Sequence, residues 1–459
     1  MTFNEYLVGL KGKSITVIGA GISNTPLIKA LLAADIDTTV RDKRSHGELG
    51  DVAIHFEGLG AKIVLGENYL QDLSADVIFR TPGLMPTSPA LVDAVKGGAI
   101  LTSEMEVFFD VCPCSIIAVT GSDGKTTTTS IIAQLLRNEG KTAHVGGNIG
   151  APLLCRADDM APNHIVVLEL SSFQLITMKK CPNTAVVTNL APNHLDVHKD
   201  MDEYVEAKRN IFLAQGSSDR VVLNLDNEYT RAYASLAPGE VLFFSRRESV
   251  RDGIYENDAT IYEATGGHSK AIMTADDILL PGAHNVENFM AAFAAVRGIV
   301  SYGAMLQTAK TFRGVPHRIE FVRELRGVRF YNDSIASSPT RTIAGLRAFD
   351  EKVILIAGGK GKGIAFDELG SEIASRVKAL ILTGQTAEQI QNAVANAPGY
   401  AGKPEIFICD AFADAVHKAA AMAQDGDVVL LSPACTSFDR FRNFEERGDI
   451  YKEIVRGLK

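Results

Sequence analysis

Short, continuous apolar runs alternate along most of the chain with segments whose apolar residues recur every three or four positions. A continuous apolar run is typical of a strand buried on both faces, whereas the longer period is typical of a helix. Runs of the first kind occur at 14–18, 76–79, 116–119, 165–170, 185–190, 328–331, 352–357, 379–382 and 427–431. Strands that alternate with helices in this way predict an α/β fold built on parallel sheets.

The segment 115–138 contains the clearest of these units. Its buried strand ends in a glycine-rich turn, and an amphipathic helix begins directly afterwards. Such a turn directs backbone N–H groups and the helix N-terminus at an anion. We therefore predict an ATP phosphate cradle, in which Lys125 reaches the β- and γ-phosphates and the Thr126 hydroxyl binds Mg²⁺. The predicted nucleotide contacts are Gly121, Ser122, Asp123, Gly124, Lys125, Thr126 and Thr127.

Val119 stands where the strict phosphate-loop pattern has its first glycine, so the alternative is a tight turn without a ligand. Two further strands end in residues that suit a metal: Glu169 follows one run, and His194 follows the next. Because the carboxyl ends of parallel strands share one sheet edge, Thr126, Glu169 and His194 are expected together. The alternative for His194 is a packed or capping residue.

The first 42 residues repeat the order of strand, glycine turn, helix and strand, with Gly19-Ala20-Gly21 in the turn and Asp42 about twenty residues further on. This pattern is similar to a dinucleotide-binding fingerprint, but Asn24 replaces its third glycine. A nicotinamide cofactor, another nucleotide and simple α/β packing therefore all stay open. The strand at 76–79 brings Gly83 to the same ligand-binding edge.

Three later features carry candidate chemistry. Lys208 lies in an amphipathic helix predicted for 201–212, where a lysine is ordinarily solvated. Asn285 and Asn288 are three residues apart at the start of an apolar helix, where two amides on one face either cap the helix or hold a ring or a phosphate. The segment 311–318 contains Gly and Pro between two different patterns, which is typical of a domain hinge.

Composition excludes several classes of function. The 459 residues are 46% hydrophobic and 22% charged, as in ordinary globular proteins, and the net charge of −9 argues against a general nucleic-acid or anionic-membrane surface. The six cysteines are widely spread, which favours reduced thiols in the cytoplasm. We expect neither export nor a membrane span, because there is no signal-peptide pattern and no apolar run of about 18 residues.

Taken together, these segments resemble the Mur ligases of peptidoglycan synthesis over essentially the whole chain. The resemblance rests on TGSDGKTTT, GGNIG, LELSSFQL, NHLD, EYVEAKRNIF, GAHNVEN, GVPHR, YNDS, GGKGKG and LSPACTSFDRFRNFEERG. The last motif is most specific to the branch that adds D-glutamate. Two positions depart from the pattern: Asn193 replaces an Asp of many relatives, and Ile335 replaces a Lys.

The resemblance implies three α/β domains. These are an N-terminal Rossmann-like domain for the UDP substrate (1–106), a central P-loop ATPase-type domain (107–314) and a C-terminal Rossmann-like domain with a parallel sheet for the amino acid (315–459). The resemblance also implies that the incomplete glycine fingerprint at 19–24 binds UDP. The implied contacts to the UDP substrate are Ile22, Ser23, Lys43, Arg44 and Gly83, with Asn148 and His194 at its muramoyl-alanine part.

The implied reaction uses ATP and Mg²⁺ to join D-glutamate to UDP-N-acetylmuramoyl-L-alanine through an acyl phosphate, in a monomer that acts on small molecules. Lys125, His194 and a carbamylated Lys208 would carry the catalysis, and Thr126, Glu169, His194 and Lys208 would bind the metal. Asn285, Asn288, Arg318 and Asp333 would hold the rest of ATP. Ser337, Lys362, Ser437, Phe438 and Phe444 would hold D-glutamate.

Several alternatives stay open. Lys362 could be a solvated loop lysine, and Phe444 could pack in a core. A nucleotide-binding switch would need a phosphate loop but no polar residues at the C-terminal sheet edge, where Lys362, Ser437 and Asp439 are expected to gather. A related ligase would add a diamino acid or alanine instead of D-glutamate.

Overall fold

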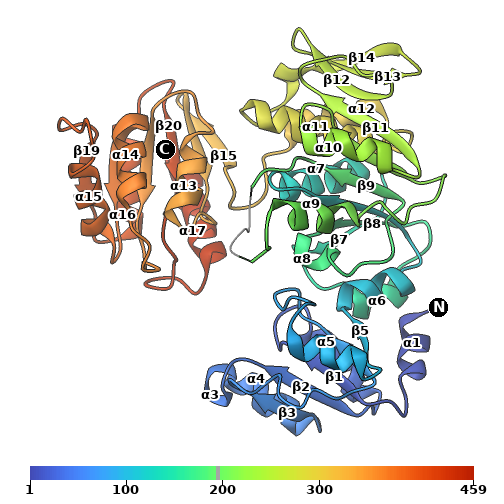
Figure 1. The fold of residues 1–459 in the computed structure, drawn as a ribbon. Coiled ribbons are helices and arrows are strands. Elements are labelled where there is room, and N and C mark those ends of the chain that lie inside the picture. Colours follow the sequence, from blue (N-terminus) through green and yellow to red (C-terminus); the bar gives the residue numbers. More distant parts are fainter. Residues whose placement is uncertain (193–196) are drawn as a thin grey trace. The chain divides into compact units, whose positions relative to one another are not determined.

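The computed structural model describes residues 1–192 and 197–459, and it contains three sheets flanked by helices (Figure 1). The predictions for His194 and Asn193 lie outside the described residues. The chain divides into a first unit, residues 1–277 with 286–309, and a second unit, residues 278–285 with 310–459. The α/β class with parallel-dominated sheets is confirmed. The domain boundaries expected near residues 106 and 314 stay predictions.

The N-terminal sheet is parallel throughout, in the order β3-β2-β1-β4-β5. Its strands are β1 (Ile15–Ile18), β2 (Thr38–Asp42), β3 (Lys62–Leu65), β4 (Val77–Phe79) and β5 (Ile100–Thr102). Its helices are α1 (Phe3–Gly9), α2 (Thr25–Ala33), α3 (His46–Leu49), α4 (Asp51–Gly58) and α5 (Pro89–Lys96), and α6 (Glu104–Val111) leads onward. The strand order reverses between β1 and β4, and ligands of open α/β sheets bind beside the carboxyl ends of such a pair.

The central sheet has nine strands, in the order β14-β13-β12-β11-β10-β9-β6-β8-β7. They are β6 (Ser115–Thr120), β7 (Ala143–Gly147), β8 (Ile165–Glu169), β9 (Thr184–Val187), β10 (Arg220–Asn224), β11 (Glu240–Ser245), β12 (Gly253–Asn257), β13 (Thr260–Thr265) and β14 (His268–Thr274). The helices of this part are α7 (Lys125–Asn138), α8 (Ser172–Leu175), α9 (Met201–Arg209), α10 (Glu228–Tyr233), α11 (Ala283–Ala295) and α12 (Tyr302–Thr311), with 3-10 turns η1 (Leu154–Asp159), η2 (Ala234–Leu236) and η3 (Ala275–Asp277).

Strands β12, β13 and β14 form an antiparallel extension of this sheet that the sequence pattern did not predict. The turn between β12 and β13 is made by Asp258 and Ala259, both with positive φ, and the next turn is made by Gly266 and Gly267. Two consecutive residues with positive φ give a turn whose twist matches that of paired strands. Asp258 is a common turn residue, and Gly266-Gly267 is a typical hairpin signal, so the sequence contained signals for these turns that were not used in the prediction.

The second unit contains a six-stranded sheet in the order β15-β16-β20-β17-β18-β19. Its strands are β15 (Glu320–Leu325), β16 (Val328–Asn332), β17 (Val353–Ala357), β18 (Val377–Leu382), β19 (Glu405–Ile408) and β20 (Val428–Leu431). All are parallel except the edge strand β15. Helices α13 (Pro339–Leu346), α14 (Asp367–Arg376) and α15 (Ala387–Ala395) pack into one core cluster, and α16 (Phe412–Met422) and α17 (Phe444–Gly457) pack into the other.

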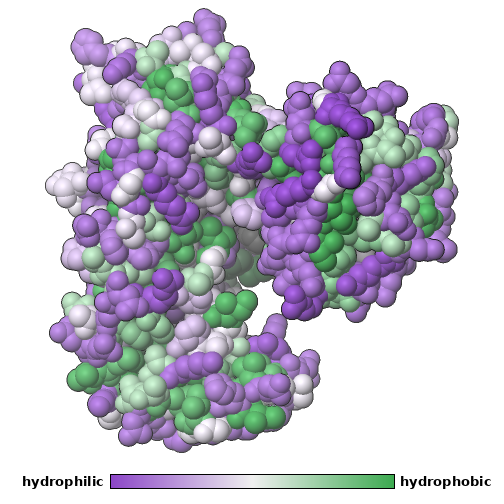
Figure 2. Space-filling model, turned by 180° about the vertical axis from the view of Figure 1, so that it is seen from behind, coloured by the Kyte–Doolittle hydropathy of each residue, from purple (hydrophilic) through white to green (hydrophobic). Residues whose placement is uncertain are grey.

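The surface seen in Figure 2 is largely hydrophilic, with hydrophobic residues interspersed. Single exposed apolar side chains are ordinary in folded proteins. Two of the most exposed, Ile22 at 83% and Phe438 at 64%, are residues for which we predicted ligand contacts. Within residues 1–192 and 197–459, no helix combines the length and the apolar character that a membrane crossing requires.

Candidate active site

The phosphate loop closes tightly between β6 and α7. Gly121 has a φ of +147° and Gly124 has a φ of +77°. A Cβ atom on Gly121 would lie 1.9 Å from Thr188 Oγ1, and one on Gly124 would lie 2.2 Å from Asn288 Oδ1. Only glycine fits at both positions, because side chains crowd the loop and its backbone is left-handed. The glycines therefore allow close packing of the loop against β9 and α11.

Several groups of the loop are engaged by the segment that follows β9. The Ser122 N–H donates to the carbonyl of Asn189 at 2.9 Å, and the Asp123 N–H donates to Asn189 Oδ1 at 3.0 Å. Lys125 Nζ donates to the carbonyl of Ser122 at 2.9 Å, so this side chain curls over the loop. Helix α7 begins without a side-chain cap, which leaves the N–H groups of its first turn suited to an anion.

Glu169 ends β8 in a buried position and is 2% exposed. Its Oε1 atom accepts a hydrogen bond of 2.8 Å from Asn148 Nδ2. Its Oε2 atom is buried and has no hydrogen-bond partner among residues 1–192 and 197–459. A buried carboxylate oxygen without a partner costs free energy, and hard cations such as Mg²⁺ bind such oxygens. The carboxylate of Glu169 therefore fits a metal ion.

Within the described residues, no three His, Cys, Asp or Glu side chains come together at spacing suited to a metal. The predicted set of metal ligands also includes Thr126, which is partly buried at the start of α7, and His194, which lies outside the described residues.

Lys208 is buried in α9, at 2% exposure, so the interpretation of this residue as a solvated surface lysine is wrong. Its Nζ atom donates to Thr120 Oγ1 at 3.2 Å and lies 4.7 Å from the centre of the Tyr204 ring. Burial lowers the pKa of Lys208 well below its usual value, and the charge of Lys125 lowers it further, against opposing effects of Glu169 and Asp123. Burial therefore favours a neutral amine.

An aromatic stack beside Lys208 was missed by the sequence analysis. The rings of Phe173 and His198 are parallel with centres 5.1 Å apart, and the Tyr204 ring meets His198 edge-on. The Tyr204 hydroxyl lies 3.1 Å from Ser122 Oγ, whose own proton is donated to the carbonyl of Ala191. Tyr204 is therefore the donor to Ser122. Tyr204 lies four residues before Lys208 in the predicted helix, so the sequence indicated that the two side chains share a helix face.

The carboxylate of Asp42 is engaged in hydrogen bonds within the protein. Its Oδ2 atom accepts hydrogen bonds of 2.8 Å from the Ala20 N–H and from Arg44 Nη2, and its Oδ1 atom accepts from Arg44 Nε at 2.9 Å. Burial raises the pKa of Asp42, but the hydrogen bonds from Arg44 and Ala20 outweigh it and lower the pKa to about 2. Asp42 therefore holds the turn after β1 and the Arg44 side chain in place.

The remaining UDP-site predictions lie at the carboxyl ends of the N-terminal strands. Ile22 and Ser23 follow β1, Lys43 follows β2 and Gly83 follows β4, and all four are exposed.

The residues predicted for ATP are divided between the two units. In the first, Asn288 Oδ1 accepts a hydrogen bond of 3.2 Å from Thr128 Oγ1, beside the phosphate loop. In the second, Asn285 Nδ2 donates to the carbonyl of Pro281 at 2.6 Å. Asp333, at the end of β16, is buried and accepts from Ser432 Oγ at 2.7 Å. Burial raises the pKa of Asp333 to about 7. Arg318 lies in the loop before β15.

The D-glutamate predictions gather at the carboxyl edge of the second unit's sheet. Lys362 Nζ donates to Ser337 Oγ at 3.1 Å, and Lys362 is exposed. Ser437 is buried after β20, and Phe444 begins α17 with its carbonyl accepting from Ser334 Oγ at 2.8 Å. Lys362 and Ser337 are thus brought together from segments 25 residues apart.

Arg447 supports this edge and was not predicted. It is 2% exposed, and its Nη2 atom donates to the carbonyls of Ser334 at 2.8 Å and Cys435 at 3.2 Å. Burial lowers its pKa to about 10, so it keeps its charge at neutral pH. The guanidinium therefore ties the turn after β16 to the turn after β20.

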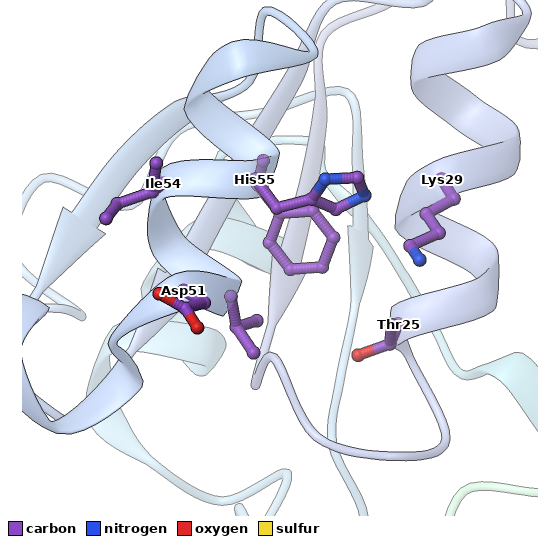
Figure 3. A pocket seen from close by; sticks show the side chains of 7 residues that line it. Thr25, Lys29, Asp51, Ile54 and His55 are labelled. Carbon is purple, nitrogen blue, oxygen red and sulfur yellow. The ribbon is translucent and has the colours of Figure 1, made fainter.

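A groove of about 530 Å³ lies between α2 and α4 (Figure 3). His55 and Lys29 point toward each other across it. It is lined by Thr25, Lys29, Asp51, Val52, Ile54, His55 and Phe56, none of which we predicted as a ligand contact.

Two family models match the chain. The Mur ligase middle domain matches residues 119–296, and the Mur ligase glutamate ligase domain matches residues 317–435. A protein of Ruminiclostridium cellulolyticum named UDP-N-acetylmuramoylalanine--D-glutamate ligase is 50% identical over 460 residues, which are 99% of this chain and 99% of that protein. A protein of Clostridium novyi with the same name is 50% identical over 459 residues, with 100% and 99% coverage.

Solved structures agree on the fold. MurF from Acinetobacter baumannii aligns with a TM-score of 0.56 at 14% identity, over 84% of this chain and 92% of that one. UDP-N-acetylmuramate-alanine ligase MurC from Thermotoga maritima aligns with a TM-score of 0.54 at 17% identity, over 97% of this chain and 100% of that one. At these identities the alignments show a shared architecture alone.

Proposed function

Because the chain belongs to the Mur ligase family, we infer that it is an ATP-dependent ligase that joins D-glutamate to UDP-N-acetylmuramoyl-L-alanine during peptidoglycan precursor synthesis. The observation that carries this conclusion is the full-length identity of 50% to proteins that bear the name of this activity. The fold alone would not separate this reaction from others. The phosphate loop and the polar sheet edge of the second unit supply the chemistry that the activity needs.

The first step joins the alanyl carboxylate to the γ-phosphoryl group of ATP, giving an acyl phosphate and ADP. An anion must approach a polyanion, so charge neutralisation dominates this step. Lys125 extends from the start of α7, and its contact with the Ser122 carbonyl is exchanged for the phosphates when ATP binds. The N–H groups of the first helical turn hold the phosphates in line with the carboxylate.

Two Mg²⁺ ions would neutralise charge on the phosphates and the reacting carboxylate. Thr126 and Glu169 would bind one ion, and His194 would bind the other, beside the reacting carboxylate. This assignment is supported by the Oε2 atom of Glu169, which is buried and has no hydrogen-bond partner among the described residues. Asn148 orients the carboxylate by donating to its other oxygen, Oε1. Asn148 thereby combines a predicted substrate contact with a role in fixing the metal ligand.

Lys208 would act as a carbamate. Its neutral amine attacks CO₂, a C–N bond forms, and one proton leaves to solvent, which turns the neutral amine into an anionic oxygen ligand suited to Mg²⁺. A lysine with a lowered pKa has the neutral amine that this addition requires. Its burial beside Thr120, at the end of the strand that leads into the phosphate loop, supports the assignment.

In the second step the amine of D-glutamate attacks the acyl carbon, the C–N bond forms, and phosphate leaves with the acyl oxygen. The amine must lose a proton, and the two carboxylates of D-glutamate need donors. Lys362 supplies a charged donor beside the hydroxyl of Ser337, and Ser437 supplies a further hydroxyl on the neighbouring turn. Phe438 and Phe444 would cover the acceptor's hydrocarbon part.

The other assignments follow the same proposal. Ile22, Ser23, Lys43, Arg44 and Gly83 would hold the UDP moiety, and Asn285, Asn288, Arg318 and Asp333 would hold the nucleoside of ATP. We propose a cytoplasmic monomer that acts on soluble small molecules and binds neither nucleic acid nor membrane.

Phosphate release tests this function. The purified protein is incubated with ATP, Mg²⁺ and UDP-N-acetylmuramoyl-L-alanine, and single amino acids of D and L configuration are added in turn. We expect phosphate release with D-glutamate and background release with L-glutamate, L-lysine, diaminopimelate and alanine. Release with a diamino acid or alanine instead would transfer the chain to another branch of the family. ATP binding without release for any amino acid would favour the nucleotide-binding switch.

A further inference from the structure

Arg80 is a buried arginine between the segments that the proposed function assigns to the two ends of the nucleotide-sugar substrate. It follows β4 directly and is 1% exposed. The loop after it contains Gly83, assigned to the UDP moiety. The segment that follows Glu169, whose carboxylate accepts a hydrogen bond from the predicted muramoyl-alanine contact Asn148, continues into α8. Both segments belong to the first unit.

The guanidinium of Arg80 donates hydrogen bonds in two directions. Its Nη1 atom donates to the carbonyls of Pro82 at 3.2 Å and Leu84 at 2.8 Å, in the loop after β4. Its Nη2 atom donates to the carbonyl of Phe173 at 2.9 Å and to Thr177 Oγ1 at 3.2 Å. One nitrogen therefore holds the loop of the UDP site, and the other holds a segment 93 residues further along the chain.

This arrangement resists movement. A guanidinium is planar and presents its N–H donors in a fixed fork, so it sets the spacing of the carbonyls that it binds. The side chain is buried with its charge, and the carboxylate of Glu106 supplies an opposing charge. If either segment moved, a buried charged donor would lose its acceptor, which is costly. Arg80 thus acts as a rigid spacer between the two segments.

We propose that Arg80 is a positioning residue for the nucleotide-sugar substrate, because it fixes the distance between the loop that holds UDP and the segment that follows Glu169. This inference rests on the proposed function, in which one substrate is bound at both of these places. A change in spacing misplaces the alanyl carboxylate whenever the UDP moiety is seated. A displacement of about 1 Å can reduce a rate by roughly a hundredfold.

Arg41 provides a matched control. It is also a buried arginine of the N-terminal sheet, at 8% exposure. Its Nη1 atom donates to the carbonyls of Tyr69 at 3.0 Å and Gln71 at 2.8 Å, and its Nη2 atom donates to that of Asp72 at 3.2 Å. All three carbonyls lie in the one segment between β3 and β4. Arg41 therefore shares the burial and chemistry of Arg80 without joining two parts of the substrate site.

The experiment compares Arg80→Met with Arg41→Met in the full-length protein. We expect both variants to unfold at a lower temperature than the wild type. We expect Arg80→Met alone to lower kcat/KM for the UDP substrate by about tenfold or more, with the KM for ATP within about twofold of the wild type. If Arg80→Met loses stability but keeps the kinetics of the wild type, as Arg41→Met is expected to do, Arg80 is merely structural and the proposal is wrong.

Thr177→Val provides the test if Arg80→Met does not fold. It removes one acceptor of Nη2 and keeps the guanidinium with its carbonyl partners. We expect a smaller loss of kcat/KM for the UDP substrate and no change in the KM for ATP, whereas unchanged kinetics would contradict the proposal. If the wild-type protein does not ligate D-glutamate, the proposed function is wrong, and so is the role of Arg80 that depends on it. If the wild-type protein ligates D-glutamate and Arg80→Met has the same kcat/KM for the UDP substrate, only the role of Arg80 is wrong.

Discussion

The Nζ atom of Lys208 lies 3.2 Å from the Oγ1 atom of Thr120, although the two residues are 88 positions apart in the sequence. Thr120 is the last residue of β6, so this contact sets α9 against the strand that leads into the phosphate loop. The Thr120 hydroxyl donates its own proton to the carbonyl of Leu170 at 2.8 Å, one residue beyond Glu169. Thr120 therefore connects the buried lysine to both strands that carry the predicted chemistry.

We expect Lys208→Ala to lose nearly all ligase activity. Without the carbamate the site lacks one anionic oxygen ligand, and a small carboxylic acid that enters the vacated space should restore part of the activity. The matched control is Lys199→Ala, since Lys199 is exposed just before the same helix. The measurement is phosphate release with and without the acid, together with a ¹³C NMR signal for a carbamate after incubation with labelled bicarbonate. A fully active Lys208→Ala variant would contradict the assignment.

Lys125→Ala should abolish phosphate release and leave binding of the UDP substrate nearly intact. Removing one group that stabilises charge in a transition state typically costs about a hundredfold or more in kcat. The residues proposed to contact UDP follow strands of the N-terminal sheet, so calorimetric titration with the UDP substrate should give a dissociation constant within about threefold of the wild type. Lys141→Ala, at an exposed position after the same helix, is the control. Near-normal turnover of Lys125→Ala would exclude this loop as the phosphate cradle.

Lys362→Ala should raise the KM for D-glutamate far more than the KM for ATP. A hydrogen bond from a charged donor contributes roughly 1.5–3 kcal/mol, which corresponds to an increase of about tenfold to a hundredfold. Lys360→Ala is the matched control, because Lys360 is an exposed lysine of the same turn whose backbone pairs with Thr436. Equal effects of the two variants on the KM for D-glutamate would show that Lys362 is an ordinary loop lysine.

Asp333 should make the stability of the second unit depend on pH. Burial raises its pKa from 3.8 to about 7, so between these values the folded state keeps a proton that the unfolded state has released. The contribution of Asp333 to stability is therefore full below about pH 4, falls as the pH rises to about 7, and is constant above that.

Asp333→Asn should flatten this dependence, because the amide does not titrate. Its oxygen can still accept from the Ile319 N–H, and its amino group can donate to Ser432 Oγ. Hydrogen exchange of peptides from β16 and β20 in urea at pH 5 and pH 8 measures the effect in the second unit. The same pH dependence in both proteins would contradict the assigned pKa shift.

The sequence was sufficient to locate elements whose signal is local. The apolar run before Glu169 and the glycines before Lys125 appear in the structure as β8 and the phosphate loop, because burial on both faces leaves a contiguous pattern. The antiparallel strands β12 to β14 were not predicted, although Gly266 and Gly267, between β13 and β14, are a typical hairpin signal.

Long-range partners were outside the reach of the sequence pattern. No local sequence pattern distinguishes Arg80, which precedes the loop at Gly83. Only the fold brings the carbonyl of Phe173 within 2.9 Å of it. Arg447 is a similar case, because its acceptors at Ser334 and Cys435 come from two different strand ends. Burial of Lys208 likewise follows from the packing of α9 against the central sheet. No local pattern distinguishes it from a surface lysine.

The most direct test of the proposed ligase reaction is mass spectrometry of the products formed from ATP, D-glutamate and UDP-N-acetylmuramoyl-L-alanine whose alanyl carboxylate carries ¹⁸O at both oxygens. An acyl phosphate intermediate transfers one carboxylate oxygen to the departing phosphate. We predict a UDP-linked product that has gained one D-glutamate residue through an amide bond, together with phosphate that contains one ¹⁸O atom. A reaction that yields ADP and unlabelled phosphate, with no D-glutamyl product, would contradict the account.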